Sequence, residues 1–153
     1  MRTGLITFLI TLFLDQLSKI WVVVWLDLKS VGSIDVLPPL VNFRMAWNRG
    51  VNFGLFAGDG NRWILIAIAL IVCAAVLYWV RGETDRRVHI STGLLVGGAI
   101  GNIIDRLVYG AVADFLNMSC CGISNPFSFN VADIAVFIGA FGLVIWSGKE
   151  KPA

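Results

Sequence analysis

Four apolar segments divide the chain, and polar or charged residues bound each of them. They cover residues 5–26, 63–80, 90–109 and 131–146 of the 153 residues, and 58% of the whole sequence is hydrophobic. Few water-soluble domains of this size contain such runs, whereas a membrane-spanning helix needs about 20 mostly apolar residues. The sequence therefore predicts an all-α membrane protein, a single domain over residues 1–153 with four transmembrane helices.

The first apolar segment begins like a secretory signal peptide, because Arg2 precedes the apolar run Leu5–Leu14. The apolar character continues past Asp15 and Lys19 for a full span, and no small-residue cleavage site follows. We therefore expect a retained helix.

The charges beside the spans predict the orientation of the chain. The basic residues next to the span ends are Arg2, Arg81, Arg86, Arg87, Lys149 and Lys151. Because Lys and Arg are enriched on the cytoplasmic side, both termini are expected in the cytoplasm and the loops 27–62 and 110–130 outside. Residues 34–47 alternate loosely between apolar and polar, which indicates short strands in the first outer loop.

Composition excludes several classes of function. The net charge is only +2 and the basic residues are scattered, so we expect no nucleic-acid partner. Three cysteines and one histidine, none at ligand spacing, predict no metal site, and we expect no cofactor. The single histidine, His89, lies on the predicted cytoplasmic side, so it cannot activate a nucleophile in the outer loops.

Two aspartates stand where apolar segments meet their outer edge, and the predicted topology brings them together. Asp114 follows the third segment and Asp133 opens the fourth. Two adjacent carboxylates do not both ionise easily, so one can hold a proton while the other acts as a base toward water. Two simpler interpretations stay open: Asn130 and Asp133 as a helix N-terminal cap, and Asp114 as an exposed loop acid.

The helix ends predict different roles for the two aspartates. The positive end of the fourth helix favours an ionised Asp133, whereas Asp114 follows the negative end of the third helix. Asp133 is therefore predicted to be the base.

Further polar residues lie inside the apolar segments. Asp15 and Lys19 are four residues apart, as are Asn102 and Arg106, and Asp105 is adjacent. Such residues either support a wet site open to the outside or tie helices together.

Four motifs follow one another in an order that resembles a known family. They are Asp15-Gln16-x-x-Lys19, Asn48-x-Gly50-x-x-Phe53-Gly54, Gly101-Asn102-x-x-Asp105-Arg106 leading to Gly110-x-Val112-x-Asp114-Phe115, and Phe129-Asn130-x-Ala132-Asp133. With the four apolar segments, they resemble the bacterial lipoprotein signal peptidases, the type II signal peptidases that act as aspartic proteases in the membrane.

The resemblance implies that Asp114 and Asp133 are the catalytic pair. It gives substrate-binding or supporting roles to Asn48, Gly50, Asn102, Asp105, Arg106, Asn130, Asp15 and Lys19. The family's substrate is a prolipoprotein whose cysteine carries diacylglycerol, and cleavage just before that cysteine releases the signal peptide. The implied fold adds a small extracytoplasmic β-like cradle and a short helix in the first loop.

The resemblance further implies a bacterial cytoplasmic membrane protein with its active site at the outer face. Its partners are the lipid-modified prolipoprotein and membrane lipid, and we expect a monomer. Asn52 departs from the family pattern, in which Ala or Ser precedes the Phe-Gly pair, and Cys120 and Cys121 have no explanation. The alternative is a non-enzymatic membrane protein, either a small proton-coupled transporter or an assembly subunit.

Overall fold

A computed structural model describes residues 2–38, 40–50, 61–119 and 125–148 of the chain. Its helices are α1 (Arg2–Lys19), the π-helical η1 (Ile20–Trp25), α2 (Leu28–Val31), α3 (Asn61–Trp79), the 3-10 turn η2 (Val80–Gly82), α4 (Arg86–Tyr109) and α5 (Val131–Trp146). Its strands are β1 (Ser33–Leu37), β2 (Val41–Asn48) and β3 (Val112–Met118). Asn52, Cys120 and Cys121 lie outside the described residues.

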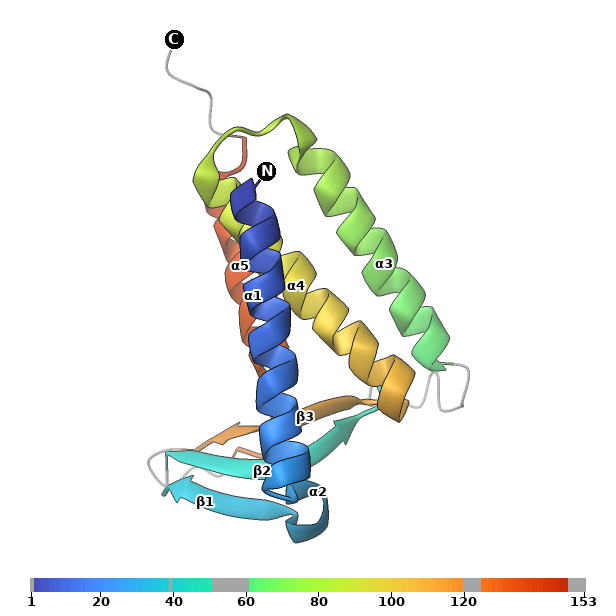
Figure 1. The fold of residues 1–153 in the computed structure, drawn as a ribbon, viewed down its shortest axis with the longest axis vertical. Coiled ribbons are helices and arrows are strands. Elements are labelled where there is room, and N and C mark those ends of the chain that lie inside the picture. The colour runs from blue at the N-terminus through green and yellow to red at the C-terminus, as the bar shows by residue number, and fades with distance from the viewer. Residues whose placement is uncertain (1, 39, 51–60, 120–124, 149–153) are drawn as a thin grey trace.

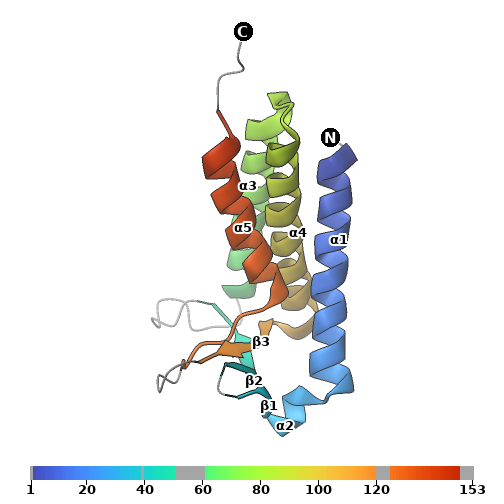
Figure 2. The same ribbon diagram turned by 90° about the vertical axis from the view of Figure 1, so that its left-hand side faces the viewer.

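The helices form a bundle with the sheet at one end (Figure 1). Helix α4 packs against α1, α3 and α5, and Figure 2 shows α1, α4 and α5 side by side above the three strands. Helix α1 begins and α5 ends at the end of the bundle opposite the sheet (Figures 1 and 2).

Glycines allow the helices to approach closely. A Cβ atom on Gly97 would lie 2.9 Å from the Phe8 carbonyl oxygen of α1, and one on Gly139 of α5 would lie 2.6 Å from the Leu95 nitrogen of α4. A Cβ on Gly98 would collide with the Ala132 carbonyl at the start of α5. Small residues at these positions therefore let α4 pack closely against α1 and α5.

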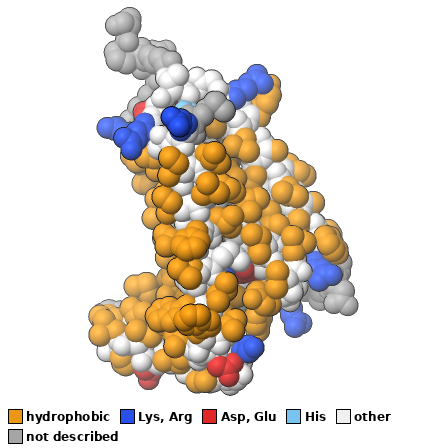
Figure 3. Space-filling model, viewed as in Figure 1, with side chains coloured by type: hydrophobic (Ala, Val, Ile, Leu, Met, Phe, Trp, Pro, Cys, Tyr) orange, Lys and Arg blue, Asp and Glu red, His pale blue; other side chains and the backbone are white. Residues whose placement is uncertain are grey.

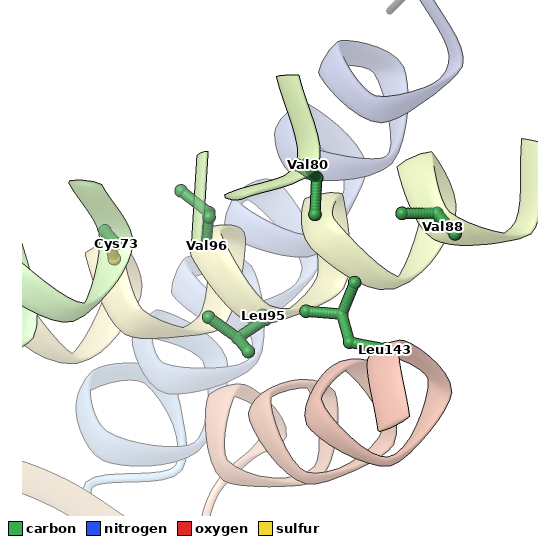
Figure 4. Close-up of a cluster of buried hydrophobic side chains, with 6 residues drawn as sticks. All are labelled: Cys73, Val80, Val88, Leu95, Val96 and Leu143. Atoms are coloured by element: carbon green, nitrogen blue, oxygen red, sulfur yellow. The ribbon is translucent and has the colours of Figure 1, made fainter. Parts of the chain in front are cut away.

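A small apolar cluster joins the three helices α3, α4 and α5. It consists of Cys73, Val80, Val88, Leu95, Val96 and Leu143 (Figure 4). The outward side chains are largely hydrophobic as well, and Figure 3 shows them over most of the bundle's visible face. An apolar exterior on an apolar bundle is what contact with lipid requires.

The sheet is antiparallel in the order β1-β2-β3. Residue 46 of β2 pairs with Asp114 of β3, and Asn48 pairs with Val112. Phe115 of β3 packs with Val22 of η1 and Leu28 of α2, so the sheet is fixed against the end of the first helix.

Much of the predicted fold is present. Strands β1 and β2 fall in the range expected to be β-like, and α2 is a short helix in the first loop. Among the described residues, three helices are long and apolar enough to cross a membrane, namely Arg2–Trp25, Arg62–Gly82 and Arg86–Tyr109, and α5 is a shorter apolar helix. The third strand, β3, was not predicted.

Candidate active site

Asp114 lies in β3 and is only 3% exposed. The interpretation of this residue as an exposed loop acid is therefore wrong. Strand β3 is covered on one side by β2 and on the other by residue 129, because the backbone N–H groups of Phe115 and Leu116 both donate to the Phe129 carbonyl. Asp114 is therefore a buried residue of a strand that is paired on both edges.

Asp133 lies in the first turn of α5, where the helix-cap interpretation is correct. The side chain of Asn130 accepts a hydrogen bond from the Asp133 N–H at 2.9 Å, and Asp133 Oδ2 accepts one from the Asn130 N–H at 3.2 Å. The second carboxylate oxygen, Oδ1, accepts a hydrogen bond from Asn102 Nδ2 at 2.9 Å. Asp133 therefore caps its helix and also faces the polar residues of α4.

Asn130 joins the two aspartates. Its Nδ2 donates to Asp114 Oδ1 at 2.7 Å, while its Oδ1 accepts from the Asp133 backbone. The same Nδ2 is 3.2 Å from Asn102 Oδ1. Because Asn130 is completely buried and its backbone N–H also donates to Asp133 Oδ2, this single residue helps to fix the positions of both carboxylates relative to each other.

The electrostatics of the site favour a proton on Asp114. Burial, and then the negative charge of Asp133, raise the pKa of the Asp114 carboxyl to about 6. Hydrogen bonds from Asn48 and Asn130 and the charge of Lys19 act in the opposite direction. The two carboxylates are thus close enough to affect each other's ionisation.

The buried Lys19 of α1 links this helix to α4 beside the candidate site. Lys19 Nζ lies 2.8 Å from Asp15 Oδ2 and 2.8 Å from Asp105 Oδ2. It also donates to Asn102 Oδ1 at 3.2 Å. Gln16, which sequence reasoning did not select, donates to Asp15 and Asp105 as well. Its sequence signals are its place in the motif Asp15-Gln16-x-x-Lys19 and a polar side chain inside an apolar segment.

Asp15 and Asp105 also accept hydrogen bonds from backbone N–H groups next to the two candidate aspartates. Asp105 Oδ2 accepts a hydrogen bond from the Ala113 N–H at 3.0 Å, and Asp15 Oδ1 accepts one from the Ala132 N–H at 3.0 Å. Ala113 immediately precedes Asp114, and Ala132 immediately precedes Asp133. Lys19 therefore binds the carboxylates of both Asp15 and Asp105. These two carboxylates in turn bind the backbone immediately before Asp133 and Asp114.

The remaining predicted residues lie around the same place. Arg106 is half-buried on α4 and donates to the Asn102 carbonyl at 3.1 Å. Asn48, at the end of β2, accepts a hydrogen bond from the Gly50 N–H at 3.0 Å. Gly50 has a φ of +108°, which side chains with a Cβ rarely adopt.

The arrangement suits acid–base chemistry. Within the described ranges, no three His, Cys, Asp or Glu side chains are placed to hold a metal ion. The polar groups that do converge are two carboxylates and the amides that orient them, and such a pair can activate water and protonate a carbonyl oxygen.

Known proteins resemble this chain over nearly its whole length. A lipoprotein signal peptidase from Methylorubrum extorquens is 42% identical over 153 residues, which cover 99% of this chain and 88% of that protein. One from Rhodopseudomonas palustris is 37% identical over 157 residues, covering 99% of this chain and 95% of that protein. A bacterial membrane enzyme solved by the in meso method at 1.9 Å shares the fold with a TM-score of 0.82 and 25% identity, covering 99% and 96% of the two chains.

The family model described as signal peptidase (SPase) II matches residues 7–148. These residues include every candidate site residue described above. The chain therefore belongs to the signal peptidase II family, the lipoprotein signal peptidases.

Proposed function

We propose that this chain is an aspartic endopeptidase that removes signal peptides from diacylglyceryl-modified prolipoproteins, with Asp114 and Asp133 as its catalytic pair. Family membership supports the reaction, and the relatives are named lipoprotein signal peptidases. The observation that carries the assignment of the pair is the buried Asn130, whose side-chain nitrogen donates to the Asp114 carboxylate and whose backbone N–H donates to the Asp133 carboxylate.

The two aspartates divide the proton transfers. Asp133 takes a proton from a water molecule as the water oxygen attacks the scissile carbonyl carbon, and Asp114 donates its proton to the carbonyl oxygen. Asp133 then gives its proton to the amide nitrogen of the resulting diol, and as the carbon–nitrogen bond breaks the diol returns one hydroxyl proton to Asp114. The released amine becomes the new N-terminus of the lipidated cysteine.

Two observations support Asp133 as the base and Asp114 as the acid. The raised pKa of Asp114 keeps a proton on it at a pH where an ordinary carboxyl has lost one. Asp133 stands in the first turn of α5, where the helix dipole favours a negative charge. The same ordering follows from the sequence.

The other residues position the pair and the substrate. Asn102 donates to Asp133, and Asn130 joins both carboxylates. Arg106 and Asn48, beside Asp133 and Asp114, orient the peptide, and Gly50 forms the turn that holds Asn48. Asp15, Lys19 and Asp105 fix the backbone on which the pair stands.

The orientation in the membrane is also a proposal. The chain is a bacterial inner-membrane protein, and α5 forms a fourth span together with the three longer apolar helices. The sheet then lies at the outer face, where water reaches the aspartates, and both termini lie in the cytoplasm. We expect one copy of the chain to suffice, because every group named above comes from a single chain.

A cleavage assay tests the proposed reaction. Purified protein in detergent is given a prolipoprotein peptide with a diacylglyceryl cysteine, and the products are identified by mass spectrometry. We expect a single cut directly before the modified cysteine and no cut in the same peptide without the lipid. Equal cleavage of both peptides, or cleavage elsewhere, would contradict the proposal.

A further inference from the structure

We propose that a groove at the end of the bundle opposite the sheet binds an anionic phospholipid. One acyl chain lies along the groove between α1 and α3, and the phosphate lies at Arg81 and His89. This inference is independent of the peptidase reaction, because the groove and the aspartate pair are at opposite ends of α4.

The groove has the shape of a chain-binding site. Its volume is about 370 Å³, and α4 forms its floor while α1 and α3 form its sides. Its apolar lining includes Leu5, Phe8, Leu77, Val80, Val96 and the glycines 4 and 93. The α4 lining residues run from His89 to Val96, about 10 Å at 1.5 Å per residue, which accommodates about eight methylene groups.

The groove opens toward lipid rather than toward the core. Leu5 and Leu77 on its two sides are 60% and 51% exposed, whereas Val96 of α4 and Val80 of η2 are buried. An acyl chain can therefore enter sideways from the bilayer and cover apolar surface that the protein itself leaves open.

Arg81 and His89 at one end of the groove favour an anionic headgroup. The Arg81 guanidinium is stacked over the Tyr78 ring, 3.9 Å from its centroid, which orients the group and leaves its N–H groups available. No ion pair between described residues includes Arg81. His89 is half-buried in the lining and supplies an imidazole N–H near the same end.

Among the described residues, the acids at this end form no ion pair with Arg81. Asp85 accepts a hydrogen bond from the Arg87 N–H at the start of α4, and Glu83 accepts one from the Gly148 N–H. Figure 3 shows basic side chains at this end of the molecule. An anionic phospholipid matches the groove, because its acyl chain fits the apolar lining and its phosphate fits Arg81 and His89. The basic N-terminal region of a signal peptide would be repelled by the positive charge of Arg81.

Native mass spectrometry of the purified protein tests the proposal. Phosphatidylglycerol and phosphatidylcholine with identical acyl chains are titrated separately, and the bound lipid is counted. We expect preferential binding of one phosphatidylglycerol and about a fivefold loss of its affinity in Arg81→Gln, as expected for one basic residue at an anionic headgroup.

Arg87→Gln is the matched control, because Arg87 lies at the same end but over the Trp146 ring and outside the groove. It should bind phosphatidylglycerol as the unmodified chain does. Equal affinity for the two lipids would mean that the groove takes any acyl chain. An equal loss in both variants would mean nonspecific attraction. Either result overturns the proposal.

Discussion

At the scale of residues, Asn130 determines how the candidate pair is arranged. Its side-chain amide donates to the Asp114 carboxylate and accepts from the Asp133 backbone N–H, while its own backbone N–H donates to the Asp133 carboxylate, so both carboxylates are bound by one residue that bears no charge. Asp114 remains buried next to a second acid, which is an unfavourable place for a charge. Functional sites commonly accept such a cost in stability.

Asp114→Asn should therefore stabilise the protein while abolishing cleavage. The folded protein raises the pKa of this carboxyl to about 6 from 3.8, so the charged form opposes folding. The cost grows as pH rises from about 4 to about 6 and is complete above that, up to about 3 kcal/mol. Asparagine removes the charge and keeps an oxygen for Asn130.

Thermal unfolding in detergent measures this effect. We expect a higher Tm for Asp114→Asn than for the unmodified chain near pH 7.5, and no difference near pH 4, where both side chains are neutral. A variant that is less stable at both pH values would contradict the raised pKa.

Lys19 provides a second test at this scale. Lys19→Met leaves Asp15 and Asp105 buried without their cation, and breaking such a pair costs about 3–5 kcal/mol. We expect a large fall in Tm. Adding Asp105→Asn removes one of the two unpaired buried carboxylates. The double variant should therefore have a higher Tm than Lys19→Met alone, and a double-mutant cycle measures the difference. Additive losses would exclude the coupling.

At the scale of elements, the site depends on how closely α5 approaches α4. The start of α5 carries Asp133, and Gly98 of α4 contacts the Ala132 carbonyl just before it. Sequence reasoning identified α5 and its N-terminal cap. It missed β3, because a strand buried on both faces shows no alternation of polar and apolar residues.

Gly98→Ala should push the start of α5 away from α4. The added methyl group collides with the Ala132 carbonyl and displaces the first turn of α5 together with Asp133. Because a misplacement of about 1 Å can cost about 100-fold in rate, we expect kcat to fall by about that factor. Gly82→Ala is the control, since a Cβ there meets nothing within 4 Å. Equal rates in both variants would contradict the packing argument.

At the scale of the whole molecule, the sequence predicted a membrane bundle with an extramembrane sheet. It also placed Asp15, Lys19, Asn102 and Asp105 near the two aspartates, and the structure brings them together. The sequence pattern could not predict which of these polar groups are hydrogen-bonded to one another. Asp105 and Asp15 accept hydrogen bonds from the backbone N–H groups of Ala113 and Ala132, and such donors are present in every residue except proline.

Labelling of single cysteines in spheroplasts checks the orientation. In a background without other cysteines, Asp35→Cys in the sheet should react with a membrane-impermeant maleimide. Thr84→Cys, in the connection before α4, should react only after the membrane is broken. Both positions are exposed on the protein, so a difference reports the side of the membrane. The reverse pattern would contradict the proposed orientation.

The rate of signal-peptide release by purified aspartate variants tests the central claim most directly. Asp114→Asn and Asp133→Asn should each lower the rate at least about 1,000-fold, because neither proton transfer can be completed without its carboxyl group. Asp35→Asn, an exposed acid of β1, should retain the full rate. Substantial cleavage by either of the first two variants would show that Asp114 and Asp133 are not the catalytic pair.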